Sequence, residues 1–200
     1  MDFSILKQNL ENKNYKVNTF ENSKEAVAYL QKEIVNTTVG IGGSVTVDEI
    51  GLFDAIKDNN KVFWHWKDKS TLSWQETLCE AANAEIYITS ANGVAETGEI
   101  INIDGTGNRV AATMFGHKKV YIIIGKNKIA KNYDEALFRA RNIAAPLNAK
   151  RLNKETPCVK LGKCIDCNSP QRICRGLFVL WQKPTSYDCE VILINENLGY

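Results

Sequence analysis

Four of the six cysteines fall in one short stretch near the end of the chain. Cys158, Cys164, Cys167 and Cys174 follow the spacing C-x5-C-x2-C-x6-C. Four thiolates this close in sequence can reach one metal centre, and basic side chains interspersed among them favour thiolate formation. The pattern predicts a [4Fe–4S] cluster or a structural zinc site. The alternative is a set of reduced, unligated thiols or a redox-active Cys164/Cys167 pair.

A second group of candidate residues lies in the segment VGIGGSVTVDEIG, which predicts a strand, a glycine turn and a helix. Gly42 and Gly43 allow close backbone approach, and Ser44 and Thr46 offer hydroxyls to a ligand. The start of the following helix would favour an anion. The segment lacks the lysine of a phosphate-binding P-loop and the third glycine of a dinucleotide fingerprint. The alternative is a tight turn in which Ser44 only caps the helix.

A third group occupies the polar stretch TSANGVAETGEIINIDGTGNR, which follows a predicted strand. In open α/β sheets, ligands bind outside the carboxyl ends of the strands. Carboxylates placed there can act as a general base or a nucleophile. The catalytic candidates are Glu96, Glu99 and Asp104, and the ligand-binding candidates are Asn92, Asn108 and Arg109. The alternative is that the Asn-Gly and Asp-Gly pairs only form hairpin turns.

Composition excludes several classes of protein. The 200 residues are 44% hydrophobic and 24% charged, with a net charge of +2, so we expect no nucleic-acid partner and no polybasic membrane contact. The first residues do not resemble a secretory signal, and no apolar run is long enough to span a bilayer. We therefore expect a cytoplasmic protein with reduced cysteines. Cys79 and Cys189 sit in apolar contexts and are predicted to be core residues.

Short apolar strands alternate with helical patterns along most of the chain. This alternation is typical of an α/β fold with a mostly parallel, covered sheet. The strongest predicted strand covers 119–124, and a helix from Tyr133 is predicted to end at Pro146. His117 is expected to be exposed in a turn. We expect one domain over residues 1–200, carrying a cysteine-rich segment at about 155–176.

Together these segments resemble the lactate-utilisation (LUD) domain family, a former domain of unknown function found in bacterial lactate-oxidation operons. The resemblance rests on VGIGGSVTVDEIG, on INIDGTGNRVA within the polar stretch, on PLNAKRL, and on PCVKLGKCIDCNSPQRICR. It covers nearly the whole chain and is closest to the short family members with a cysteine segment near the end.

The resemblance implies a Rossmann-like three-layer αβα sandwich, similar to ribose-5-phosphate isomerase, glucosamine-6-phosphate deaminase and the CoA transferases. In those enzymes a glycine-rich turn binds phosphate or CoA, a role that falls here on Gly42, Gly43 and Ser44. Acidic residues on a loop after a central strand do the chemistry there, which makes Glu96, Glu99 and Asp104 the candidates in this chain. The resemblance also implies partner subunits in a system that oxidises lactate to pyruvate.

Two functions follow as hypotheses, besides a plain scaffold for such partners. In the first, the protein binds a small anionic ligand such as a sugar phosphate, a CoA ester or a hydroxy acid. In the second, the cysteine quartet holds iron–sulfur or zinc, and the protein is a redox accessory or scaffold. A homo-oligomer is compatible with both.

Overall fold

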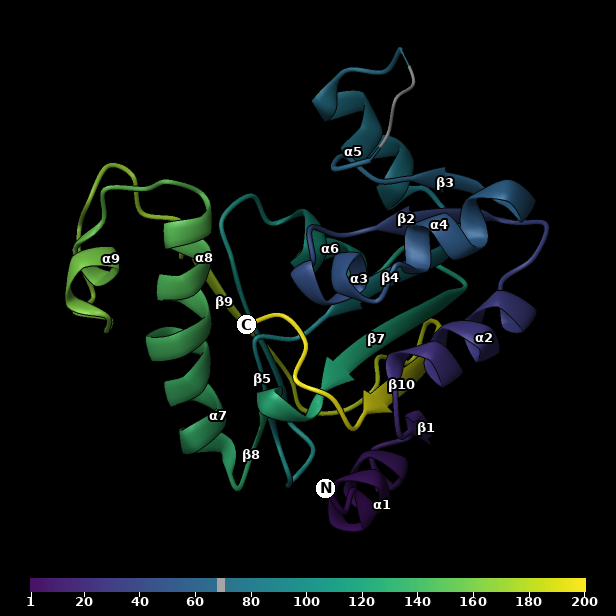
Figure 1. Cartoon of the computed structure of the whole chain (residues 1–200), viewed down its shortest axis with the longest axis horizontal. Helices are drawn as coiled ribbons and strands as arrows, with labels where there is room; N and C mark the ends of the chain where they lie inside the picture. Colours follow the sequence, from purple (N-terminus) through teal and green to yellow (C-terminus); the bar gives the residue numbers. More distant parts are fainter. Residues whose placement is uncertain (68–70) are drawn as a thin grey trace.

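The computed structural model describes residues 1–67 and 71–200 and is built around a six-stranded sheet (Figure 1). The strand order is β1-β10-β7-β4-β2-β3, and every neighbouring pair is parallel. The strands are β1 Lys16–Phe20, β2 Thr38–Ile41, β3 Lys61–Phe63, β4 Ile86–Ser90, β7 Lys119–Gly125 and β10 Asp188–Ile194.

The central strands are apolar on both faces, so the sheet needs a helical layer on each side. Val120, Ile122 and Ile124 of β7 face one core, while Tyr121 and Ile123 face the other. Helices α1 Ser4–Asn12, α5 Trp74–Ala82 and α6 Asn108–Met114 pack against the first face. Helices α2 Ser23–Glu33, α3 Val45–Glu49 and α4 Leu52–Ile56 pack against the second. The expected Rossmann-like three-layer sandwich is confirmed.

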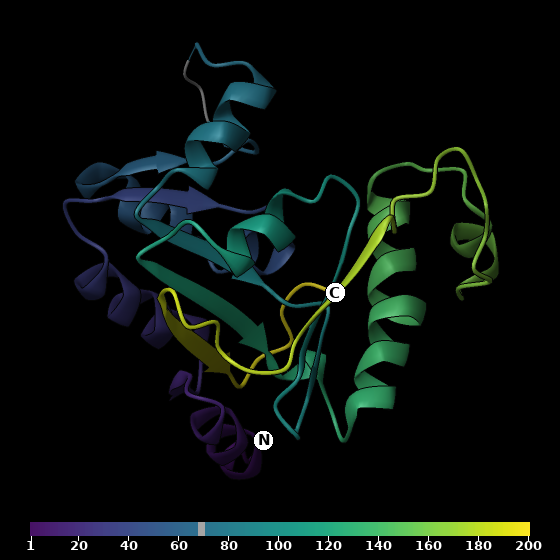
Figure 2. The same ribbon diagram turned by 180° about the vertical axis from the view of Figure 1, so that it is seen from behind.

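A smaller sheet extends from the carboxyl side of the main one (Figures 1 and 2). Its order is β8-β5-β6-β9, with β5 and β6 forming an antiparallel hairpin inside the polar stretch. The sequence offered hairpin turns in this stretch as an alternative but did not predict the sheet, because β9 follows the cysteine segment and pairs with β6 over a long separation. The strands are β5 Gly93–Ala95, β6 Ile100–Asp104, β8 Ile129–Ala130 and β9 Gly176–Leu180.

One long helical segment covers this smaller sheet and corrects the prediction for Pro146. It runs through α7 Tyr133–Arg139, a π-helical stretch Ala140–Ala144 and α8 Ala145–Arg151. The proline lies in the first turn of α8, directly after the π-helical stretch. Because the wider turn re-spaces the backbone hydrogen bonds, the proline needs no N–H there and the helix continues. The short helix α9 Pro157–Leu161 begins the cysteine segment.

Two single-residue predictions are also wrong. Cys79 lies on the exposed side of α5, whereas Cys189 is buried as expected. His117 is buried rather than exposed, because its ring stacks on Tyr87 and its Nδ1 lies 2.6 Å from the carbonyl oxygen of Ala84. Within the described ranges, every helix is too short or too polar to cross a membrane.

Candidate functional site

The carboxyl ends of the parallel strands open into a cavity of about 620 Å³. Neighbouring strands β2 and β4 continue in opposite directions, since β2 leads outward to β3 while β4 leads inward to β7. The loops that leave these two strands therefore diverge and leave a crevice between them, which is where open α/β sheets bind ligands. Ser44 follows β2, and Asn92 follows β4, so the cavity lies over this crevice.

The wall of the cavity is strongly cationic. Six of its side chains are basic, and Asp104 is its one acidic side chain among the described residues. Arg109 pairs with Asp104, and Arg172 pairs with Asp166. The other four cations have no carboxylate partner in the described part of the chain: Lys128, Arg151, Lys154 and Arg175. Such a surplus of unpaired positive charge in a recess favours an anionic ligand.

The glycine turn forms one side of this cavity. Gly43, Ser44 and Thr46 line it, whereas Gly42 lies just behind the surface. A Cβ atom on Gly42 would stand 2.8 Å from Tyr87 Oη and 2.9 Å from Arg109 Cγ, so only glycine lets the Arg109 side chain cross there. Ser44 Oγ accepts a hydrogen bond of 3.2 Å from the backbone N–H of Val47 and therefore caps α3.

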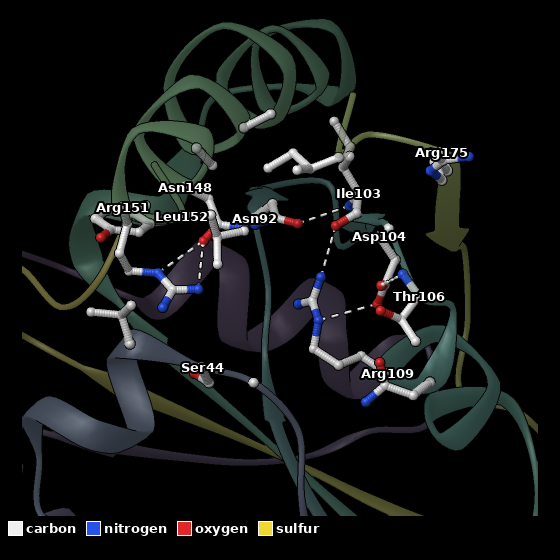
Figure 3. A pocket seen from close by; sticks show the side chains of 18 of the residues that line it. Ser44, Asn92, Ile103, Asp104, Thr106, Arg109, Asn148, Arg151, Leu152 and Arg175 are labelled. Carbon is white, nitrogen blue, oxygen red and sulfur yellow. Dashed lines mark hydrogen bonds and ion pairs between the residues drawn. The ribbon is translucent and has the colours of Figure 1, made fainter. Parts of the chain in front are cut away.

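Asn92, Asp104 and Arg109 form the opposite side (Figure 3). Asn108 also lines the cavity. The Arg109 guanidinium lies 3.1 Å from an Asp104 carboxylate oxygen and donates a 2.7 Å hydrogen bond to the carbonyl of Ile103. The second carboxylate oxygen of Asp104 accepts two backbone N–H groups of the loop before α6. Asp104 therefore shapes the loop and holds Arg109 in place.

Sequence reasoning missed several wall residues, among them Arg151 and Lys128, and the ammonium group of Lys128 is buried at the cavity wall. Its Nζ donates to Thr46 Oγ1 at 2.7 Å, to Ser90 Oγ at 2.9 Å and to the carbonyl of Ala91 at 3.0 Å. Burial, followed by the positive charges of Arg139 and Arg109, lowers the pKa of Lys128 to about 7. A signal for it was available, because Lys128 lies in the short turn after the strongest predicted strand.

An aromatic and basic cluster closes the cavity beside the glycine turn. Arg151 lies 4.6 Å from the ring of Trp66, and its guanidinium donates to Asn148 Oδ1 (Figure 3). The His65 ring also lines the wall, and its buried Nδ1 has no hydrogen-bond partner in the described residues. Burial, with the charge of Arg151, lowers the pKa of His65. The ring is therefore neutral near pH 7.

Two of the three predicted catalytic carboxylates do not line the cavity. Glu96 and Glu99 lie at the tip of the β5–β6 hairpin, against α1. The backbone carbonyl of Glu96 accepts a hydrogen bond from Asn9, and the Glu99 carboxylate pairs with Lys13 at 3.3 Å. The hairpin carries them away from the strand ends, so of the three only Asp104 stands with the glycine turn.

The four clustered cysteines line a second, smaller cavity next to the first. Arg172 and Ile173 lie in the walls of both cavities. In the described ranges, no group of three or more His, Cys, Asp or Glu side chains stands so that it could hold one metal ion. The topology thus brings the quartet together, but not in the arrangement of a single-ion site.

Comparison with known proteins places this architecture in a family. The family model described as the LUD domain matches residues 4–194. The chain belongs to the LUD domain family. Membership indicates a function of the lactate-utilisation type.

One solved structure has a similar fold. It is the crystal structure of a DUF162 family protein from Deinococcus radiodurans, with a TM-score of 0.53 at 12% sequence identity. The match covers 97% of this chain and 99% of that one. No curated protein matches the sequence.

Proposed function

We propose that the cationic cavity binds a small anionic metabolite, a hydroxy acid, a sugar phosphate or a CoA ester, and that the protein acts with partner subunits in oxidising lactate to pyruvate. The observation that carries the binding proposal is the set of four cations without carboxylate partners in the described residues of the wall. A carboxylate or phosphate group could form ion pairs with these cations. The lactate context comes from membership of the LUD family.

The arrangement suits recognition of an anion at more than one point. Arg151 is fixed over Trp66, and Arg109 is fixed by Asp104, so both guanidiniums are oriented before a ligand arrives. Such preorganisation reduces the entropy lost on binding. Lys128 is joined to the glycine turn by its hydrogen bond to Thr46. Its ammonium group therefore lies near the place where Ser44 and Gly43 would contact an anion.

Isothermal titration with inorganic phosphate, ribose 5-phosphate, acetyl-CoA, L-lactate and pyruvate tests this function. We expect at least one to bind, with affinity reduced about tenfold or more in Arg151→Gln, the loss typical of one charge-assisted hydrogen bond. Ser44→Ala should also lower the affinity for that ligand. The matched control is Lys118→Gln, which removes an equal charge from an exposed pair with Glu85.

An equal reduction of ligand affinity in Arg151→Gln and Lys118→Gln would show that binding depends only on the net charge of the protein. An absence of binding by the wild-type protein across the whole panel would contradict the proposal. The partner proposal is tested separately, by purifying the tagged protein from its own cells grown on lactate and identifying what accompanies it. Size measurement of the purified protein reports whether a second copy is among those partners.

A further inference from the structure

The segment that carries the four cysteines is folded in an unusual way. Between Gly162 and Arg175 it contains no helix or strand. Each of its four cysteines is half-buried. Together with Ile165 and Ile173, they line a small cavity next to α8. The segment therefore directs all four cysteines to one place in the protein.

All four thiols face one small cavity, beside the first turns of α8. Polar groups approach two of them: the backbone N–H of Asp166 donates to Cys164 Sγ at 3.4 Å, and the Thr156 hydroxyl lies 3.2 Å from Cys158 Sγ. The Arg141 guanidinium also reaches Cys164 Sγ, at 3.9 Å. Hydrogen bonds to the ligating sulfurs are among the contacts by which proteins surround an iron–sulfur cluster.

We infer that Cys158, Cys164, Cys167 and Cys174 bind one [4Fe–4S] cluster. Four thiolates that share one zinc ion crowd around a single atom, whereas each thiolate of a [4Fe–4S] cluster binds a different iron at a separate corner. The quartet surrounds one cavity without the close approach of a single-ion site in the described residues, which fits the second geometry.

Two further features suit a cluster at this place. A cluster with four thiolate ligands is negatively charged, and Arg141 and Arg172 both line the cavity. The space now open among the thiols is about 20 Å³, so a cluster would be accommodated by outward movement of the loop. No strand pairing restrains that loop between Gly162 and Arg175.

The cluster site is independent of anion binding in the larger cavity, although Arg172 belongs to both walls. Its test is analysis of the full-length protein purified without oxygen and reconstituted with ferrous iron and sulfide. We expect about four irons and about four acid-labile sulfides per chain, with a broad visible absorption that bleaches on reduction. Cys164→Ser should lose most of the iron, whereas Cys79→Ser, an exposed cysteine outside the segment, should keep it.

Circular dichroism of both variants shows whether either has failed to fold, and in that case Cys167→Ser replaces Cys164→Ser. One zinc per chain without sulfide would overturn the inference and leave a structural metal. Metal-free wild-type protein after reconstitution, with four thiols still open to alkylation, would overturn it as well. Iron retained equally by Cys164→Ser and Cys79→Ser would show that the iron lies elsewhere.

Discussion

The two ends of the central sheet each hold a buried charged side chain, but the partners of these two side chains differ. At the amino end, the fully buried carboxylate of Glu190 contacts Lys16 at 3.1 Å and Lys119 at 2.9 Å, and accepts a hydrogen bond from Tyr29. Burial alone would raise the pKa of Glu190, but Tyr29 and Lys119 bring it below its usual value. At the carboxyl end, the buried ammonium of Lys128 has only neutral partners.

This difference separates a charge used for stability from one used for binding. The Glu190 network is complete within the chain, so a ligand would add nothing to it. The Lys128 end holds an excess of positive charge that the described residues leave without a counter-charge. Since uncompensated buried charge is costly, its retention at the carboxyl end fits a site completed by an anion.

The largest test of this contrast compares Glu190→Gln with Lys128→Met. We expect Glu190→Gln to lower the free energy of unfolding by about 2–4 kcal/mol, because it leaves two ammonium groups without their shared carboxylate. Lys128→Met should change it by about 1 kcal/mol or less at pH 7, because the loss of the hydrogen bonds to Thr46, Ser90 and Ala91 is offset by removal of a desolvated amine. Urea unfolding measures both.

If Lys128→Met proves as destabilising as Glu190→Gln, then Lys128 is a structural residue and the contrast between the two ends is wrong.

The second test uses pH. The pKa of Lys128 is about 7 in the folded protein, against about 10.4 in an unfolded chain. Between these values the unfolded state binds the extra proton, so stability should rise with pH, by up to about 1.4 kcal/mol per unit. Lys128→Met should lack that rise. Parallel unfolding of both proteins from pH 7 to 9 shows it, and identical slopes would contradict the lowered pKa.

Much of this carboxyl-end site could be predicted from local sequence. The glycine turn, Asn92, Asp104 and Arg109 follow predicted strands, and a parallel sheet collects the ends of its strands at one edge. Glu96 and Glu99 were misplaced because a hairpin reverses within a few residues, and nothing in its composition says how far it projects.

Other features depended on contacts distant in sequence. The second sheet requires β9 to pair with β6, which lies more than seventy residues earlier in the chain. Local sequence patterns do not indicate which distant strands pair. Pro146 was read as a helix end because the compensating π-helical turn has no sequence signal of its own. Lys128 was overlooked because a lysine in a turn is usually solvated, and the sequence does not distinguish it from Lys126 in the same turn.

A third test asks which predicted carboxylate belongs to the site. Asp104→Asn removes the negative charge that pairs with Arg109 but keeps an amide oxygen for the loop N–H groups, so the affinity for inorganic phosphate should rise about fivefold. Glu99→Gln removes the same charge at the hairpin tip, outside the cavity, and should leave that affinity unchanged. Titration in the same buffer measures both, and equal increases would mean that the cavity responds to total charge rather than to its own wall.

The smallest expected effect comes from adding one methyl group at Gly43, which should lower ligand affinity more than it lowers stability. A Cβ on Gly43 would lie 3.3 Å from the Trp66 ring and 3.5 Å from His65, so Gly43→Ala intrudes slightly on the cavity. Because the backbone there needs no positive φ, stability should change by about 0.5 kcal/mol or less, while phosphate affinity falls about threefold. Gly42→Ala is the contrast, since its Cβ meets Arg109 and Tyr87 behind the surface and should lower stability as well. Titration and thermal unfolding of both variants distinguish the two positions. An unchanged phosphate affinity in Gly43→Ala would move the anion away from the glycine turn, toward Arg151 and Arg175.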